Sequence, residues 1–239
     1  MRSDHTPYWL AQWLDRAAAL YAERYRFPHC ESVGEGSRLT NGRHVSFSGP
    51  GIRLGRFVHL YAMRDASIQI STWALGDRNP RIVIDDYCIV NPGVRVIAAE
   101  HIEIGPGTQL ATGAYLTDAD WHGVHHRVYP PGDTAPVILE ENCWVADRAT
   151  VLKGVRVGRN SIVAAGAIAT KDVPPNTIVA GNPARTVKEI DPDAPSTTRR
   201  DLYEILDYVA FEKRYRRDQL AHNGLLRWLR TLVLPRRGD

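Results

Sequence analysis

The sequence has few cysteines, and they form no recognisable framework. Its 239 residues include only Cys30, Cys88 and Cys143, an odd number whose spacings match neither a metal site nor a disulfide pattern. Unpaired thiols are typical of reducing compartments, so we expect a cytoplasmic protein with reduced cysteines. This argues against the disulfide-rich secreted folds.

Long apolar runs are also missing. The N-terminal segment MRSDHTPYWLAQWLDRAAAL has no basic start followed by a continuous apolar stretch, so we expect no signal peptide there. No stretch reaches the roughly 18–20 apolar residues of a membrane span. Apolar residues still make up 44% of the chain, which is enough for a sizeable core.

Neither sign of charge predominates, except in the C-terminal tail. The formal net charge is +3, but residues 195–239 hold ten Lys or Arg against six Asp or Glu, a net of +4. This basic cluster has no accompanying nucleic-acid-binding motif. We therefore expect no nucleic-acid partner.

An aliphatic residue recurs at every sixth position in the second half of the chain, and a small or β-branched residue follows it four positions later. A helix repeats apolar positions at three and four and a strand at two, so neither explains this step. The two series are Leu139, Val145, Val151, Val157, Val163 and Ala169, and Cys143, Ala149, Val155, Ser161, Ala167 and Val173.

The same register appears upstream, in the runs Leu54–Leu60, Ile84–Val90–Val96 and Ile104–Leu110–Leu116. A period of six is typical of a hexapeptide β-solenoid, in which each hexapeptide forms one short strand and three form a triangular coil. The aliphatic residue would point into the prism. We therefore predict a mainly β fold, a parallel β-helix over residues 43–190. The alternative, a β-sandwich with irregular strands, does not hold a strict step of six.

Helical patterns flank the repeat. Over residues 7–26 apolar residues recur at three and four, so this helix is expected to cap the open end of the prism or to pack on its side. The tail is expected to be helical from a linker near 191–195 to about 233, with a break at Gly224. The predicted parts are an N-terminal helical cap (1–42), the β-helix (43–190) and a C-terminal helical basic tail (191–239).

The end of the tail, LLRWLRTLVLPRR (225–237), is both apolar and basic. One interpretation is a helix that packs on its own or on a neighbouring subunit. The other is an interfacial membrane contact, a role that basic amphipathic segments with Trp can have. The second would suit a lipid-linked glycan acceptor.

The repeat and the segment NCWVADRATVLKGVRVGRNSIVAAGAIATKDVPPNTIVAGNPARTV (142–187) together resemble the hexapeptide-repeat acyltransferases, especially their maltose, galactoside and nodulation-factor O-acetyltransferase branch. The resemblance implies a left-handed β-helix and a homotrimer with active sites between subunits. It also implies acetyl-CoA or another acyl-CoA as cosubstrate, with no metal. The implied reaction transfers a short acyl group to a hydroxyl of a sugar or glycan.

One large break interrupts the repeat. Leu116 and Leu139 are 23 residues apart, so 117–137 must leave the prism as a loop with three His, three Asp and one Trp. Loops on a rigid scaffold commonly carry function. Acyl transfer needs a base with a pKa near neutrality, and the ordinary pKa of histidine is about 6.5.

His122, in Asp120-Trp121-His122-Gly123, matches the position of the family's catalytic histidine, so the resemblance implies that it is the general base. His125 and His126 remain alternatives. Asp118 and Asp120 are candidates to orient the imidazole or to bind acceptor hydroxyls. A backbone carbonyl would orient the ring equally well, and the two aspartates could also be simple solvated loop residues.

Asn91, in Val90-Asn91-Pro92-Gly93, aligns with a family asparagine that contacts the acceptor near the catalytic histidine. We therefore include it among the catalytic and substrate-binding candidates. The alternative is local turn chemistry, because Asn-Pro-Gly is a strong turn signal.

The donor site is expected in the C-terminal coils. Trp144 precedes an inward position and so points outward, where the resemblance implies that it lines the CoA channel. Lys171 and Arg185 would bind the CoA phosphates, because fixed cations suit phosphate oxygens. Thr170 belongs to the same motif, and the backbone of Ala165 would meet the pantetheine. The alternative for Lys171 is an ordinary surface lysine.

Other activities also occur on this fold. An N-acyltransferase acting on an amino sugar is the nearest alternative. A γ-type carbonic anhydrase would need three zinc-binding histidines from adjacent coils. The candidates for those are His101, His122, His125 and His126, and three of the four share one loop. A non-catalytic trimeric scaffold is the third possibility.

Overall fold

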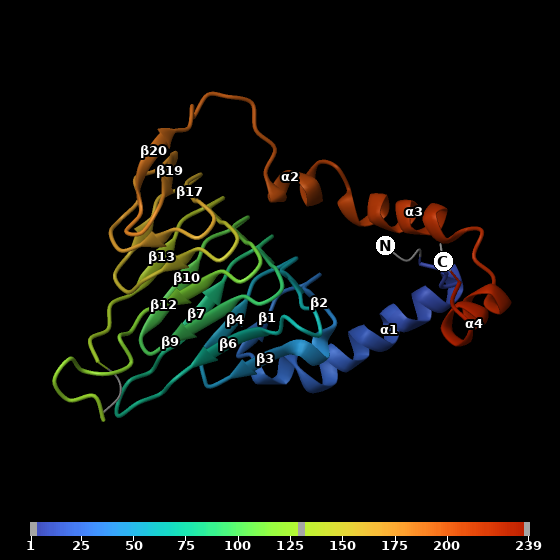
Figure 1. Cartoon of the computed structure of the whole chain (residues 1–239), viewed down its shortest axis with the longest axis horizontal. Coiled ribbons are helices and arrows are strands. Elements are labelled where there is room, and N and C mark those ends of the chain that lie inside the picture. The colour runs from blue at the N-terminus through green and yellow to red at the C-terminus, as the bar shows by residue number, and fades with distance from the viewer. Residues whose placement is uncertain (1–3, 129–131, 237–239) are drawn as a thin grey trace.

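The computed structural model describes residues 4–128 and 132–236 and shows a parallel β-helix with helices before and after it (Figure 1). Successive strands are assigned in turn to three sheets, so the chain winds around a triangular prism. The predicted fold class, a left-handed parallel β-helix of hexapeptide repeats with helical extensions, is confirmed.

We name the sheets A, B and C, and neighbouring strands pair in parallel except for β19 and β20. Sheet A contains β1 (Ser32–Val33), β4 (Ile52–Leu54), β7 (Arg81–Ile84), β10 (His101–Ile104), β13 (Val137–Leu139) and β16 (Arg156–Val157). Sheet B contains β2 (Arg38–Thr40), β5 (His59–Tyr61), β8 (Ile89–Val90), β11 (Gln109–Leu110), β14 (Trp144–Val145), β17 (Ile162–Val163), β19 (Thr177–Ala180) and β20 (Arg185–Glu189). Sheet C contains β3 (Val45–Ser48), β6 (Ile68–Thr72), β9 (Arg95–Ala98), β12 (Tyr115–Thr117), β15 (Thr150–Val151) and β18 (Ile168–Ala169).

The prism begins before residue 43, which was its predicted start. β1 pairs with β4, and β2 pairs with β5. Val33, Leu39 and Val45 already follow the step of six, so the first coil obeys the same rule as the later ones. Its single-turn length hid that signal next to the helical segment.

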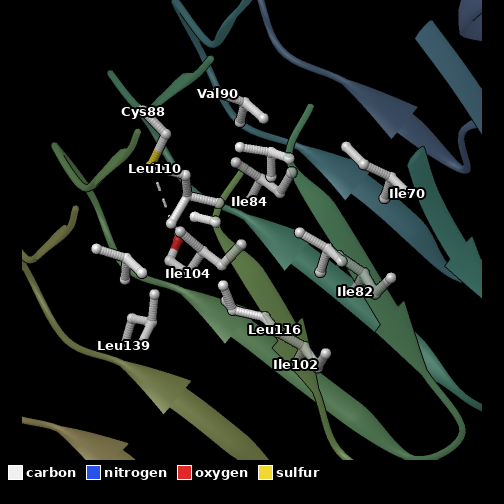
Figure 2. Close-up of a cluster of buried hydrophobic side chains, with 14 of the residues drawn as sticks. Ile70, Ile82, Ile84, Cys88, Val90, Ile102, Ile104, Leu110, Leu116 and Leu139 are labelled. Carbon is white, nitrogen blue, oxygen red and sulfur yellow. Dashed lines mark hydrogen bonds between the residues drawn. The ribbon is translucent and has the colours of Figure 1, made fainter. Parts of the chain in front are cut away.

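The core of the prism is a set of stacked aliphatic ladders. Every member of the two predicted series between Leu139 and Val173 is at most 4% exposed. Figure 2 shows the middle coils, where Ile84, Ile104 and Leu139 stack in register on sheet A beside Val90 and Leu110 on sheet B. Each such side chain contributes about 1.5–3 kcal/mol by leaving water, so the ladders hold the coils together.

The three corners of the prism differ in regularity, and we name them by the sheets they join. At the A–B corner, the step between inward residues is six in every coil from β1 to β17. At the C–A corner, the steps are 7, 14, 8, 23 and 6 residues along the chain. The pairs that define these steps are Phe47–Leu54, Ile70–Ile84, Val96–Ile104, Leu116–Leu139 and Val151–Val157.

The N-terminal helix α1 (Tyr8–Tyr25) meets the prism only at its C-terminal end. The 3-10 turns η1 (Phe27–His29) and η2 (Gly42–His44) lie at this junction, and Ala22 is part of the buried core. Only the last turns of the helix pack on the prism, since Ala22 is buried in the core while Trp9 and Trp13 are 59% and 61% exposed. The helix is anchored by its last turns, so its earlier turns extend beyond the prism (Figure 1).

The C-terminal tail folds back onto its own prism through α2 (Arg199–Glu204) and α3 (Tyr208–Leu220). The Tyr203 ring lies 5.0 Å from Phe57 and 5.7 Å from Tyr87 at the A–B corner. Arg38 of β2 forms an ion pair of 2.7 Å with Glu212 of α3. These contacts attach the first part of the tail to the N-terminal coils.

The last helix, α4 (Leu225–Val233), begins after Gly224, at the predicted break. The side chain of Asn223 donates to the carbonyl oxygens of Asp4 and Thr6, which places α4 beside the start of α1 (Figure 1). Arg237 of the predicted basic segment lies outside the described residues. Within the described ranges, the structure contains no helix with the length and apolarity needed to cross a membrane.

Candidate active site

Two loops leave the prism at the C–A corner (Figure 1). One, residues 73–80, joins β6 to β7, and the other joins β12 to β13 and contains His122. The second is the predicted loop, described here except for residues 129–131. The first was not predicted, although the 14-residue step from Ile70 to Ile84 is its signal in the sequence.

His122 is exposed at the surface of its loop. Its backbone N–H donates to the Asp120 carbonyl oxygen at 2.7 Å, and Trp121 between them has a φ of +60°. A Cβ atom added at Gly132 would lie 2.4 Å from the His122 carbonyl oxygen. The two arms of the loop therefore touch behind His122, at a point where only glycine fits, and this contact fixes its backbone.

Asp118 has a structural role, which corrects its assignment as a substrate-binding residue. Its carboxylate is fully buried and accepts three backbone N–H bonds of 2.7–2.8 Å, from Ala99, Glu100 and His101. Burial raises the pKa of Asp118, and the three N–H donors oppose that rise. The carboxylate joins the base of the loop to the turn between β9 and β10 and is shielded from solvent.

Asp120 forms an ion pair of 2.8 Å with Lys153, and its side chain stays partly exposed. Lys153 comes from the turn after β15, on the next coil of the same corner. Sequence reasoning missed Lys153 because it lies at a regular hexapeptide turn. The ion pair therefore holds a cation against a carboxylate that lies two residues before His122 in the chain.

Lys171 and Arg185 lie together, as the donor-site prediction requires. They line one surface pocket of about 270 Å³ at the C-terminal end of the prism, together with Asp172, Ala184 and Thr186. Both side chains are exposed, and Thr170 directly precedes this pocket. Two cations around a pocket of this size can bind phosphate oxygens.

The remaining predicted residues lie elsewhere on the prism. Trp144 is 45% exposed on the outer face of sheet B. Asn91 and Ala165 both occupy turns of the B–C corner, and the Asn91 amide donates to the Leu110 carbonyl oxygen at 2.9 Å. A single chain therefore does not bring these three residues to His122, which lies at the C–A corner.

The cysteines lie in or against the core. Burial raises the pKa of Cys30, Cys88 and Cys143 to about 12, so these thiols are poor nucleophiles at neutral pH. Among residues 4–128 and 132–236, no three His, Cys, Asp or Glu side chains are placed to hold a metal ion.

The chain has relatives among acetyltransferases. It is 31% identical over 111 residues to galactoside O-acetyltransferase of Escherichia coli (strain K12), over 46% of this chain and 48% of the relative. It is 50% identical over 62 residues to 2,3,4,5-tetrahydropyridine-2,6-dicarboxylate N-acetyltransferase of Staphylococcus aureus (strain bovine RF122 / ET3-1), over 26% of each chain. The chain thus spans about half or less of the length of these curated relatives. No family model matches it.

Among solved structures, AntD, an N-acyltransferase from Bacillus cereus in complex with dTDP and 3-hydroxybutyryl-CoA, has the same fold. Its TM-score is 0.55 at 15% identity, over 90% of this chain and 100% of that chain. At that identity the likeness concerns the fold alone. Taken with the sequence relatives, it confirms the suspected resemblance: over its repeat, this chain is similar to the hexapeptide-repeat acyltransferases.

Proposed function

We propose that the chain is an acyltransferase that moves an acetyl or other short acyl group from acyl-CoA to a hydroxyl of a sugar or glycan, with His122 as the general base. The proposal is supported by the residues that lie together at the C–A corner. This corner holds an exposed histidine on a braced loop, and the cations Lys153 and Lys171 follow on the next coils of the same corner. The similarity to galactoside O-acetyltransferase supports a sugar hydroxyl as acceptor.

The chemistry needs only this arrangement and the two substrates. His122 accepts the proton of the acceptor hydroxyl while the hydroxyl oxygen attacks the thioester carbonyl carbon. The tetrahedral intermediate then loses the CoA sulfur, and the imidazolium returns the proton to it. General-base catalysis of this kind contributes about 10²–10⁴-fold in rate. In the proposed donor site, Lys171 and Arg185 hold the CoA phosphates.

The test is a thioester assay on the whole protein. Acetyl-CoA is mixed with maltose, methyl β-galactoside or glucosamine, and the released CoA thiol is measured. The proposal expects acceptor-dependent release with at least one sugar. The absence of release with every acceptor, at protein concentrations that bind CoA, would overturn it.

An amine acceptor is the second candidate. Its support is the 50% identity to an N-acetyltransferase and the shared fold with AntD. Hydroxylamine separates the two outcomes, because it cleaves an ester product and leaves an amide intact. A glucosamine product that resists hydroxylamine would replace the O-acyl assignment by the N-acyl one.

We also propose a homotrimer with active sites between subunits. Its support is the separation of His122 from Asn91 and Ala165, which lie at different corners of one prism. Corners of different chains can meet when prisms pack side by side. The residues of the resemblance would then form one site from two copies.

Mixed oligomers test this arrangement. His122→Ala and Ala165→Trp, each expected to be inactive alone, are co-expressed with different tags and purified as mixed trimers. Sites built from two copies would recover about a third of the wild-type activity, because each mixed trimer has one interface at which both contributing residues are intact. Mixed trimers with no recovered activity would show that each site lies within one chain.

The helical ends carry a third part of the proposal, peripheral contact with an anionic membrane by a cytoplasmic enzyme. Leu226 and Leu232 of α4 are 83% and 62% exposed, beside the exposed Trp9 and Trp13 of α1. Between Asp218 and Asp239 the sequence contains four arginines and no acidic residue. An apolar helix in a segment whose charged side chains are all arginines suits anionic lipid.

Vesicle flotation tests this contact. The protein is expected to float with phosphatidylglycerol vesicles and not with phosphatidylcholine vesicles, and Leu226→Glu should abolish flotation without changing CoA binding. Failure to float with either vesicle would overturn the membrane contact and leave another copy of the chain as the cover for this face.

A further inference from the structure

The loop over residues 73–80 brings a second tryptophan to the histidine loop. Trp73 follows β6 directly, and its ring centroid lies 5.9 Å from that of Trp121 at an interplanar angle of 63°. Its backbone N–H still donates to the Ala98 carbonyl oxygen at 2.8 Å. The position of Trp73 is therefore set by the sheet, while its ring reaches across to the residue before His122.

The histidine loop holds the second ring just as firmly. The Trp121 indole N–H donates to the Thr117 hydroxyl at 3.0 Å, and Trp121 has a φ of +60°, which a bulky residue adopts only when its surroundings impose it. Farther out, the Arg78 guanidinium donates to the Thr134 hydroxyl at 2.6 Å. The two loops are thus joined at two points on the same side of the prism.

This pair is not simply a buried packing contact. Trp73 is 51% exposed, and Trp121 is only partly buried. Two indoles that meet nearly edge to face leave an open angle between them, and exposed aromatic surface next to polar groups is typical of ligand sites. The residues on either side of Trp121 in the chain are polar: His122 follows it, and Asp120, which pairs with Lys153, precedes it.

We propose that Trp73 and Trp121 form the acceptor subsite, an aromatic corner that binds the apolar C–H face of a sugar ring and presents one of its hydroxyls to His122. This inference rests on the proposed function. A pyranose combines a flat face of C–H groups with hydroxyls at its rim, so one ring can contact an indole and reach the base beside it. Trp73 would determine acceptor binding.

The substitution Trp73→Ala tests the subsite by separating acceptor binding from catalysis. We expect the KM for the sugar acceptor to rise roughly tenfold, which corresponds to about 1.4 kcal/mol, because the sugar loses one aromatic face. The kcat should stay within about threefold of wild type and the Kd for CoA should not change, since an interaction made equally in ground and transition states affects KM alone. Trp73→Phe should restore most of the binding.

Two further variants keep the result unambiguous. Phe211→Ala removes an aromatic ring of similar exposure from α3, whose Glu212 pairs with Arg38 of β2, and should leave the acceptor KM unchanged. Arg78→Ala breaks the second loop contact and spares both rings, so it should raise the acceptor KM less than Trp73→Ala does.

The outcomes separate this proposal from the function on which it rests. If the wild type transfers acyl groups to sugars and Trp73→Ala keeps the wild-type acceptor KM, the subsite is overturned while the function stands. A fall in kcat with an unchanged KM would also overturn it, since Trp73 would then only support the histidine loop. If the wild type acylates no sugar, both proposals fail.

Discussion

The A–B corner keeps a six-residue step from β1 to β17, whereas the C–A corner inserts loops between β6 and β7 and between β12 and β13. At the A–B corner, one residue of each turn lies in the left-handed region. In the last coils these are Asn142, Asn160 and Asn176, whose side chains are linked by hydrogen bonds of 3.0 Å. At the C–A corner, the corresponding positions are occupied by the two loops that contain Trp73 and His122.

Toward the two ends of the A–B corner, the left-handed position of each turn is occupied by different residue types. In the second and third coils the left-handed positions are Phe57 and Tyr87, whose rings stack at 5.8 Å. Tyr203 of α2 covers them, and Glu204 accepts a hydrogen bond of 2.6 Å from the Tyr87 hydroxyl. The A–B corner thus carries structural contacts toward both ends, and the candidate chemistry lies at another corner.

The largest loss of stability is expected in the core beside the A–B corner. Leu110 is fully buried in the middle of the ladder, so Leu110→Ala should lower the free energy of unfolding by about 2–5 kcal/mol through lost burial and a cavity. Urea unfolding followed by circular dichroism measures the change. Val124→Ala, at an exposed position of the histidine loop, is the control and should change stability by less than about 0.5 kcal/mol.

The next effect concerns CoA affinity at the end of the prism. Replacing both Lys171 and Arg185 by alanine should weaken CoA binding about 10- to 100-fold, which corresponds to a combined loss of roughly 1.4–2.8 kcal/mol from two cations that are exposed to solvent. Isothermal titration with CoA gives the Kd. Lys213→Ala removes an exposed cation from α3 and serves as the control. Unchanged affinity in the double variant would move the phosphate site elsewhere.

A smaller effect is expected from the asparagine ladder. Asn160→Ala removes both ladder hydrogen bonds and places alanine at a φ of +58°, for a loss of about 1–3 kcal/mol in the free energy of unfolding. Asn160→Gly removes the same bonds without the backbone strain and should lose less. Equal losses in the two variants would mean that the hydrogen bonds carry the whole effect.

The last effect appears only in acid. Burial, followed by the charges of Arg38 and Arg199, lowers the pKa of His59 from 6.5 to about 3, and the ring is held at 2.8 Å from the Thr40 hydroxyl. Below pH 6.5 the His59 side chain binds a proton in the unfolded chain, whereas in the folded chain it stays neutral down to about pH 3. The free energy of unfolding therefore falls as the pH drops from 6.5 to 3.

His59→Gln removes that proton uptake. The variant should show a shallower decrease of melting temperature between pH 6.5 and pH 3, and the same slope as wild type above pH 7. Parallel curves over the whole range would show that His59 does not contribute to acid sensitivity.

Much of the fold could be predicted, because a step of six constrains every residue that it covers. Leu139 through Val173 are buried as their positions in the repeat require. The same pattern also located the histidine loop, since 23 residues cannot fit a turn. It could not show which way α1 faces, because an amphipathic helix with its apolar side exposed has the same sequence pattern as one that is packed.

The candidate site was less predictable because it depends on contacts between turns of different coils. Asp118 looked like a loop carboxylate, yet its partners are backbone N–H groups of a preceding turn. Trp73 and Lys153 gave no local signal, and they reach the site only because the C–A corner stacks their turns beside that of His122. The separation of Asn91 from His122 is likewise a property of the three-cornered prism.

The central claim is that the irregular corner carries the chemistry and the regular corner carries the stability. The most direct test measures kcat for acyl transfer and the melting temperature of His122→Ala, with His125→Ala and His126→Ala as matched controls on the same loop. The account predicts that His122→Ala loses about 10²–10⁴-fold in kcat with an unchanged melting temperature and CoA affinity, while the two controls stay near wild type. A kcat for His122→Ala close to that of the wild type, or a loss shared equally by all three variants, would contradict it.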